Sequence, residues 1–170
     1  MKGIKEMRLR YISYGLRESH KRFHEYLKTT DKQYSSPIVA SLTELLMWIS
    51  VSNEWHYRNN NAENSYEDRK IKNPGGQCVE GLRYAFNSLK HEMTFIKLIS
   101  TKGENYLYAD RYLEDYSTDS IWLKADGLIE YNPRNEKDRE NYTKYVADKT
   151  VVETVDKACK FLIEEYNKVK

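Results

Sequence analysis

The chain has 170 residues, of which 39% are hydrophobic and 32% are charged. This length predicts a single domain, residues 1–170, and the composition excludes a wholly disordered chain. The formal net charge of +2 is too small to indicate nucleic-acid binding by itself. Residues 1–34 carry nine Lys or Arg against four Asp or Glu, whereas residues 104–140 carry five against ten. Such an asymmetry is usually solvated helix surface, but it is also compatible with a basic binding face.

The sequence contains no recognisable targeting, membrane or metal motif. Residues 1–15 lack the apolar run of an export signal, and no window approaches the roughly 18 apolar residues of a membrane span. We therefore expect a cytoplasmic protein with no membrane partner. Cys78 and Cys159 are the only cysteines, and no Cys/His spacing resembles a zinc site. We expect no cofactor and no metal.

The first half of the chain predicts two helices. Apolar residues recur at helical spacing over residues 5–28, which predicts an amphipathic helix. A second helix is predicted over residues 37–58, where Ser36 and Pro37 are typical of a helix start. Apolar residues surround most of this second helix, so we expect it to be the central one. The polar tract 59–76 has no apolar period and predicts a long loop.

The second half predicts three further helices and one insertion. One continuous apolar face predicts a helix over residues 76–99. Two short apolar runs around Asp126-Gly127 favour a small irregular or β-hairpin insertion within residues 104–132. Helices follow at 137–147 and 150–168, and Thr150 with Glu153 forms a capping box for the last. The predicted fold class is mainly α, a single bundle of four to five helices.

A polar stripe on the third predicted helix is the candidate site. Arg83, Asn87 and His91 are spaced four residues apart, so they lie on one edge of the helix beside its apolar face. His91 is the residue of the three that can act as a general acid or base near neutral pH. Arg83 can hold a phosphate through paired donors, and Asn87 can orient a ligand. The residues alone favour the simpler interpretation, the polar border of a half-exposed helix with Arg83 paired to an acid on a neighbouring helix.

Three segments together resemble a known family. They are LTELLMWISVSNEWHY (42–57), GLRYAFNSLKH (81–91) and YTKYVADKTVVETVDKACKFL (142–162). They look like uncharacterised bacterial proteins with a HEPN-like domain, whose middle helix reads G/A-L-R-Y-A-R-N-x-x-x-H. Trp48 and Glu54 match a Trp and an acid on the preceding helix of that group. Tyr142, Val146, Ala147 and Val151 match the stretch before its closing helix, so the resemblance runs from about residue 36 onward.

The resemblance implies a helical bundle that usually forms homodimers. Active HEPN members cleave RNA without a metal, using an Arg followed four to six residues later by a His. A base near the ribose 2′-hydroxyl and a cation near the phosphorane explain those residue types. Related domains often belong to toxin–antitoxin, phage-defence or counter-defence systems.

The match at the catalytic motif is partial. His91 falls on the family's His and Asn87 on the residue after its Arg, but Phe86 stands at the Arg position. Arg83 lies eight residues before His91. The leading hypothesis is therefore a HEPN-like binding or regulatory protein, RNA-associated, with a degenerate site. One alternative is an active metal-independent endoribonuclease using His91 and Arg83; another is a protein-interaction module acting through the acidic region 104–140.

Four other polar residues are candidates beside this stripe. His20 and His24 have the i, i+4 spacing of metal ligands, but they lack a third ligand in sequence and are surrounded by Arg17, Lys21 and Arg22, so we expect a solvated face. We expect His56 to be a satisfied core or cap histidine. Glu54 is expected to pair with Arg83 or His91, either as part of a site or as a structural ion pair.

Overall fold

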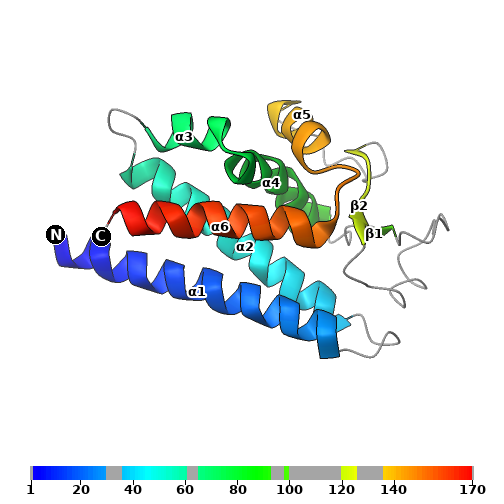
Figure 1. Ribbon diagram of the computed structural model, residues 1–170, viewed down its shortest axis with the longest axis horizontal. Coiled ribbons are helices and arrows are strands. Elements are labelled where there is room, and N and C mark those ends of the chain that lie inside the picture. The colour runs from blue at the N-terminus through cyan, green and yellow to red at the C-terminus, as the bar shows by residue number, and fades with distance from the viewer. Residues whose placement is uncertain are drawn as a thin grey trace.

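The computed structural model describes residues 2–29, 36–60, 65–92, 98–99, 120–125 and 136–169. Within them the chain is mainly helical (Figure 1). The helices are α1 (Lys2–Thr29), α2 (Ser36–Asn59), α3 (Tyr66–Lys72), α4 (Pro74–Glu92), α5 (Glu136–Tyr145) and α6 (Val151–Lys168). This confirms the predicted helical bundle, including the closing helix, where Thr150 Oγ1 accepts a hydrogen bond from Glu153 N.

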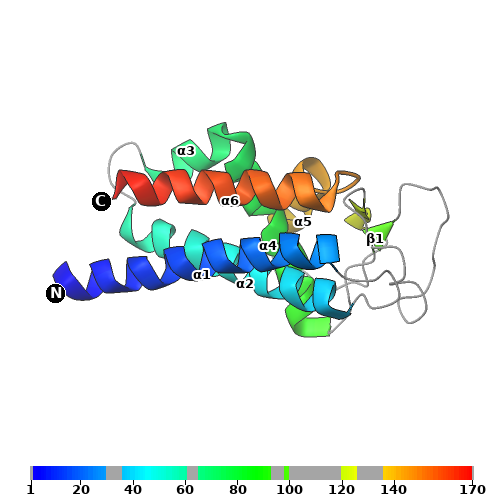
Figure 2. The same ribbon diagram turned by 60° about the horizontal axis from the view of Figure 1, so that its bottom comes forward.

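The bundle places the first and last helices side by side. In both views α6 runs along α1, and the start of α1 and the end of α6 lie at the same end of the molecule (Figures 1 and 2). The two helices are therefore antiparallel. The helix α2 also packs along α1, and α4 packs against both α2 and α6. The shorter α5 lies on α4, at the edge of the bundle.

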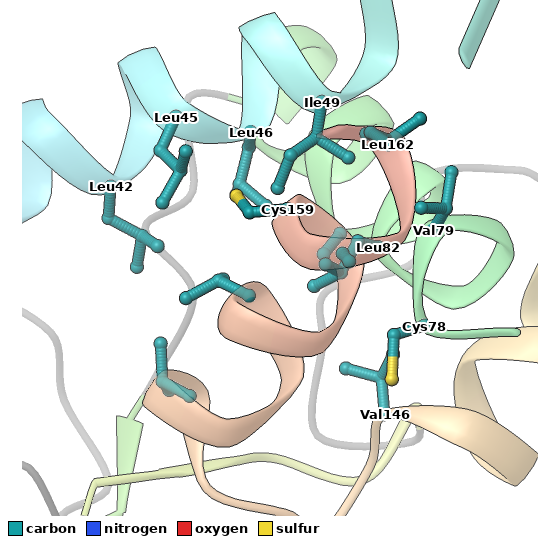
Figure 3. Packing of buried hydrophobic residues seen from close by; sticks show 14 of the residues in the cluster. Leu42, Leu45, Leu46, Ile49, Cys78, Val79, Leu82, Val146, Cys159 and Leu162 are labelled. Carbon is teal, nitrogen blue, oxygen red and sulfur yellow. The ribbon is translucent and has the colours of Figure 1, made fainter. Parts of the chain in front are cut away.

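The hydrophobic core lies between α2, α4 and α6 (Figure 3). Leu45, Leu46 and Ile49 of α2 meet Cys159 and Leu162 of α6 there. The apolar residues that α6 buries recur at helical spacing, among them Val151, Val155 and Leu162. At about 1.5–3 kcal/mol for each large apolar side chain, this burial is the main stabilising contribution.

A glycine allows α4 to approach α6 closely. A Cβ atom built on Gly75 would lie 2.2 Å from the backbone oxygen of Lys157. That contact is with backbone, which cannot rotate away as a side chain can. The first turn of α4 therefore packs directly on α6 because residue 75 has no side chain.

The predicted loop 59–76 is wrong in its second half. Residues 66–72 form α3, capped by Ser65, whose Oγ accepts a hydrogen bond from Asp68 N at 3.3 Å. The helix begins with Glu67 and Asp68 and ends with basic residues, which matches the helix dipole. It has no apolar period because the residues that it buries are Tyr66 and Lys70.

The third helix is shorter than predicted. Its described residues end at Glu92, and Leu98–Ile99, which the prediction includes in the helix, form a strand, β1. This strand pairs antiparallel with β2 (Ile121–Trp122). The predicted insertion therefore does contain a strand, β2. Its partner β1 comes earlier in the chain, whereas the predicted hairpin pairs residues on either side of Asp126-Gly127. The predicted turn at Asp126-Gly127 lies outside the described residues, as do residues 104–119.

Across the described ranges, no helix combines the length and the hydrophobicity of a bilayer-spanning segment.

Candidate functional site

The helix α4 carries the predicted stripe of Arg83, Asn87 and His91. Arg83 is exposed and Asn87, one turn further on, is half-buried. His91 belongs to the last turn of α4, and its side chain lies outside the described residues. The structure therefore places Arg83 and Asn87 on one helix edge, as predicted, while their convergence with the imidazole of His91 stays a prediction.

Arg83 contacts an acidic residue of α5. Its Nε lies 3.4 Å from Oδ2 of Asp138, a buried carboxylate. Burial raises the pKa of Asp138 above its ordinary value, and the positive charge of Arg83 offsets only part of this rise. Glu80, one turn before Arg83 on α4, also contacts α5: its Oε2 accepts a hydrogen bond from Nδ2 of Asn141 at 3.3 Å. The polar edge of α4 at these positions is thus the contact surface for α5, and Arg83 is the counter-ion of Asp138.

Phe86 is the residue at which the resemblance leads us to expect a catalytic arginine. It is partly buried and packs against the hydrophobic core, as the helical spacing predicts. An arginine at this position would have to remove its charge from water or displace the core packing. The apolar side chain of Phe86 therefore fits this partly buried position without a charge to solvate.

Glu54 does not pair with Arg83. Its Oε1 accepts a hydrogen bond from Nε of Arg58 at 2.5 Å, and both side chains are exposed. The expected pair with Arg83 is therefore wrong: Glu54 faces solvent on α2 and contacts its i, i+4 neighbour, whereas the alternative pair with His91 lies outside the described side chains.

A buried polar network around α3 has no counterpart in the sequence prediction. Lys70 is buried, and its Nζ contacts Glu80 Oε1, Glu67 Oε1 at 2.7 Å and Asn53 Oδ1 at 3.3 Å. These contacts match the three donors of an ammonium group. The hydroxyl of Tyr66 also donates to Asn53 Oδ1, at 2.8 Å. A lysine whose donors are all engaged is a structural cation.

The second part of this network joins α3 to α6. Arg69 binds the carboxylate of Glu165 in bidentate geometry, with Nε to Oε1 at 3.0 Å and the terminal nitrogen to Oε2 at 2.6 Å. Burial disfavours the charge of Glu165, but the hydrogen bonds from Arg69 and Lys168 prevail and lower its pKa. The serine of 65-SYED-68, an N-cap with an acid three residues later, is the sequence signal that predicts this helix.

His56 lies fully in the core, as predicted. Its Nδ1 lies 2.9 Å from Nδ2 of Asn60, and its ring stacks on Tyr66. Its Nε2 is buried and has no hydrogen-bond partner among the described residues, so within them the expectation of a satisfied histidine is only half correct. Burial lowers the pKa of His56 to about 4, which keeps it neutral in the folded protein.

The two cysteines are buried and unbridged. Burial raises the pKa of both Cys78 and Cys159, so their thiols stay protonated at neutral pH. Neither has the thiolate character that a nucleophile needs.

The histidine pair of α1 is not a solvated face. His20 and His24 are half-buried against α6, and both Nε2 atoms point to Oδ1 of Asp156, at 2.6 and 2.8 Å. Sequence spacing identified the two histidines but not the third group, because Asp156 lies more than 130 residues away and meets them only when α6 packs on α1.

A scan against protein-family models, a search of curated proteins and a search of solved structures each found no match to this chain.

Proposed function

We propose that this protein is a HEPN-like binding and regulatory protein, associated with RNA, whose catalytic site is degenerate. The proposal rests on the two positions where RNA cleavage would need a free arginine. Phe86 packs against the core where the family has its arginine, and Arg83 is paired with Asp138. We place the protein within the defence or counter-defence systems in which related domains occur.

The spacing along α4 also supports a non-catalytic role. Eight residues separate Arg83 from His91, which corresponds to about 12 Å along the helix axis, against about 6–9 Å for the family spacing. In-line cleavage needs the base and the cation within hydrogen-bond reach of one phosphate. Arg83 would have to abandon its contact with a buried carboxylate to span the additional distance.

A basic stripe on α1 supports RNA association. Arg10, Tyr14, Arg17 and Lys21 follow one another at intervals of three or four residues, and all four are exposed. Such a stripe can contact successive phosphates, while the tyrosine ring can stack on a base. The described part of α1 holds eight Lys or Arg against three Asp or Glu. This gives the helix a positive field although the whole chain is nearly neutral.

Binding of a labelled single-stranded RNA, measured by fluorescence anisotropy in EDTA, tests this proposal. The double variant Arg17→Gln/Lys21→Gln removes two positive charges from the stripe. We expect the slope of log affinity against log salt to fall in magnitude by about 1.4, since each phosphate contact contributes about 0.7 for a single strand.

A matched control separates the effect of the basic stripe on RNA binding from the effect of net charge. Lys137→Gln/Lys144→Gln makes the same charge change on exposed positions of α5. We expect it to leave the salt slope unchanged. Equal losses in both double variants would contradict a localised interface. Absence of RNA binding by the wild type would favour the alternative of a protein-interaction module. Asp115→Lys or Asp119→Lys should then release a captured protein partner.

We further propose that the protein is a homodimer, as the resemblance implies. Ile4, Met7 and Tyr11 are exposed by 54%, 48% and 64%, and they lie at i, i+3 and i+7 on α1. This is the spacing of a seam that packs against a second helix. By the same spacing Tyr14, seven residues after Met7 and also exposed, continues the seam, so the seam and the basic stripe meet at Tyr14.

A further inference from the structure

Two helices that are distant in sequence bring three metal-binding side chains together. His20 and His24 lie one turn apart on α1, and Asp156 lies on the facing side of α6. The ligand atoms of the three residues all lie within 4.8 Å of one another. Both imidazoles share a single carboxylate oxygen, so the cluster converges on one point.

We propose that His20, His24 and Asp156 bind a divalent transition-metal ion of the zinc class. Imidazole nitrogen and carboxylate oxygen are ordinary zinc ligands, with bonds of about 2.0–2.2 Å. In a tetrahedral site these bonds set ligand atoms about 3.3 Å apart. The Nε2–Oδ1 distances of 2.6 and 2.8 Å are shorter because protons now bridge these atoms. Metal binding replaces these protons and requires the side chains to separate by about half an ångström, which small side-chain rotations supply.

The local charges favour this site more than the sequence indicates. Arg22 is directed away from the histidines, because its guanidinium binds the carboxylate of Glu44 on α2, with Nε 3.1 Å from Oε2. Lys21 Nζ lies 3.7 Å from Glu25 Oε1. Two of the three basic neighbours that suggested repulsion of a cation are therefore paired with acids. The carboxylate of Asp156 adds a negative charge at the site itself.

The site is open on one side. The side chains of His20 and His24 are 29% and 28% exposed, and that of Asp156 is 42% exposed. Three protein ligands leave the fourth tetrahedral position open for water or another ligand. Catalytic zinc sites keep such an open position, whereas structural zinc sites use four protein ligands. The ion would also join α1 to α6, so its binding stabilises the packing of the first helix on the last.

Calorimetric titration of tag-free, chelator-treated protein with zinc chloride tests the site. We expect the wild type to bind one Zn²⁺ per chain, and Asp156→Asn and His24→Gln each to weaken binding at least tenfold. Asp148→Asn is the matched control: it neutralises an exposed aspartate away from the cluster and should leave the affinity unchanged. Unchanged affinity in Asp156→Asn would mean adventitious binding to a histidine pair, which overturns the three-ligand site.

A second measurement needs no substitution. Co²⁺ added to the wild-type apoprotein should give the intense visible absorption of a low-coordinate cobalt centre, and equimolar Zn²⁺ should abolish it. A spectrum indistinguishable from that of hydrated Co²⁺ would overturn the proposal. Zn²⁺ should also raise the melting temperature of the wild type and of Asp148→Asn but not that of Asp156→Asn, by mass action on the folded state.

Discussion

At the scale of single residues, burial decides which polar groups are available for chemistry. His56 has the right residue type for an acid–base catalyst, but it is enclosed by Trp55, Tyr66 and Tyr166 and remains neutral. Lys70 is engaged by three acceptors. Among the described side chains, the partly accessible histidines His20 and His24 converge with an acid, Asp156.

The lowered pKa of His56 predicts an acid-sensitive fold. Its pKa is about 4 in the folded state against 6.5 when unfolded, so the unfolded chain binds more protons below pH 6.5. Stability then falls as pH drops from 6.5 towards 4, by about 2 kcal/mol between pH 7 and pH 5. Glu165 and Arg69 act on His56 with opposite signs. The pKa of Glu165 is itself lowered, so the stability that its carboxylate contributes is lost only as the pH falls through that lowered pKa.

Urea unfolding of the wild type and of His56→Phe, each at pH 5 and pH 7, measures this contribution. The difference between the two pH values should be about 2 kcal/mol smaller in His56→Phe, which retains the aromatic volume and cannot be protonated. An identical pH dependence in both proteins would show that His56 is not the titrating group.

At the scale of helices, the hydrophobic pattern is a sufficient guide where apolar burial holds the helix in place. The predicted helices 5–28, 37–58 and 150–168 agree with α1, α2 and α6 to within three residues at each end. The helix α3 was missed because charged and polar contacts hold it, and a hydrophobic pattern cannot reveal these. The helix over 76–99 was extended too far because Leu98 and Ile99 continue the apolar character of α4, although they pair with β2.

The exposed apolar seam of α1 predicts dimerisation. Met7→Glu places a charge in the middle of the seam formed with Ile4 and Tyr11, while leaving the buried face of α1 intact. We expect the wild type to sediment as a dimer and Met7→Glu to dissociate at least tenfold more readily. Lys5→Glu, on the same helix, is the control for a change of charge. A wild type that is monomeric at all concentrations tested would contradict the seam.

At the scale of the whole molecule, the fold class could be predicted from the sequence and the assembly of sites could not. Arg83 and Asn87 occupy one edge of α4, as their spacing requires. Their spacing carries no information about α5, whose Asp138 binds the guanidinium. In the same way, the i, i+4 histidines were visible in sequence, but Asp156 completes the cluster only through the packing of α6 on α1. Side-chain roles that depend on two helices meeting require the tertiary structure.

Incubation of RNA with the purified protein in EDTA tests the central claim most directly, with the wild type compared with His91→Ala and Arg83→Ala. The degenerate site predicts no cleavage by the wild type at concentrations that saturate RNA binding, and the same result for both variants. Metal-dependent contributions are excluded by the chelator. Cleavage by the wild type that both substitutions abolish, without lowering the melting temperature, would contradict this account and establish an active site that uses Arg83 in place of the missing arginine.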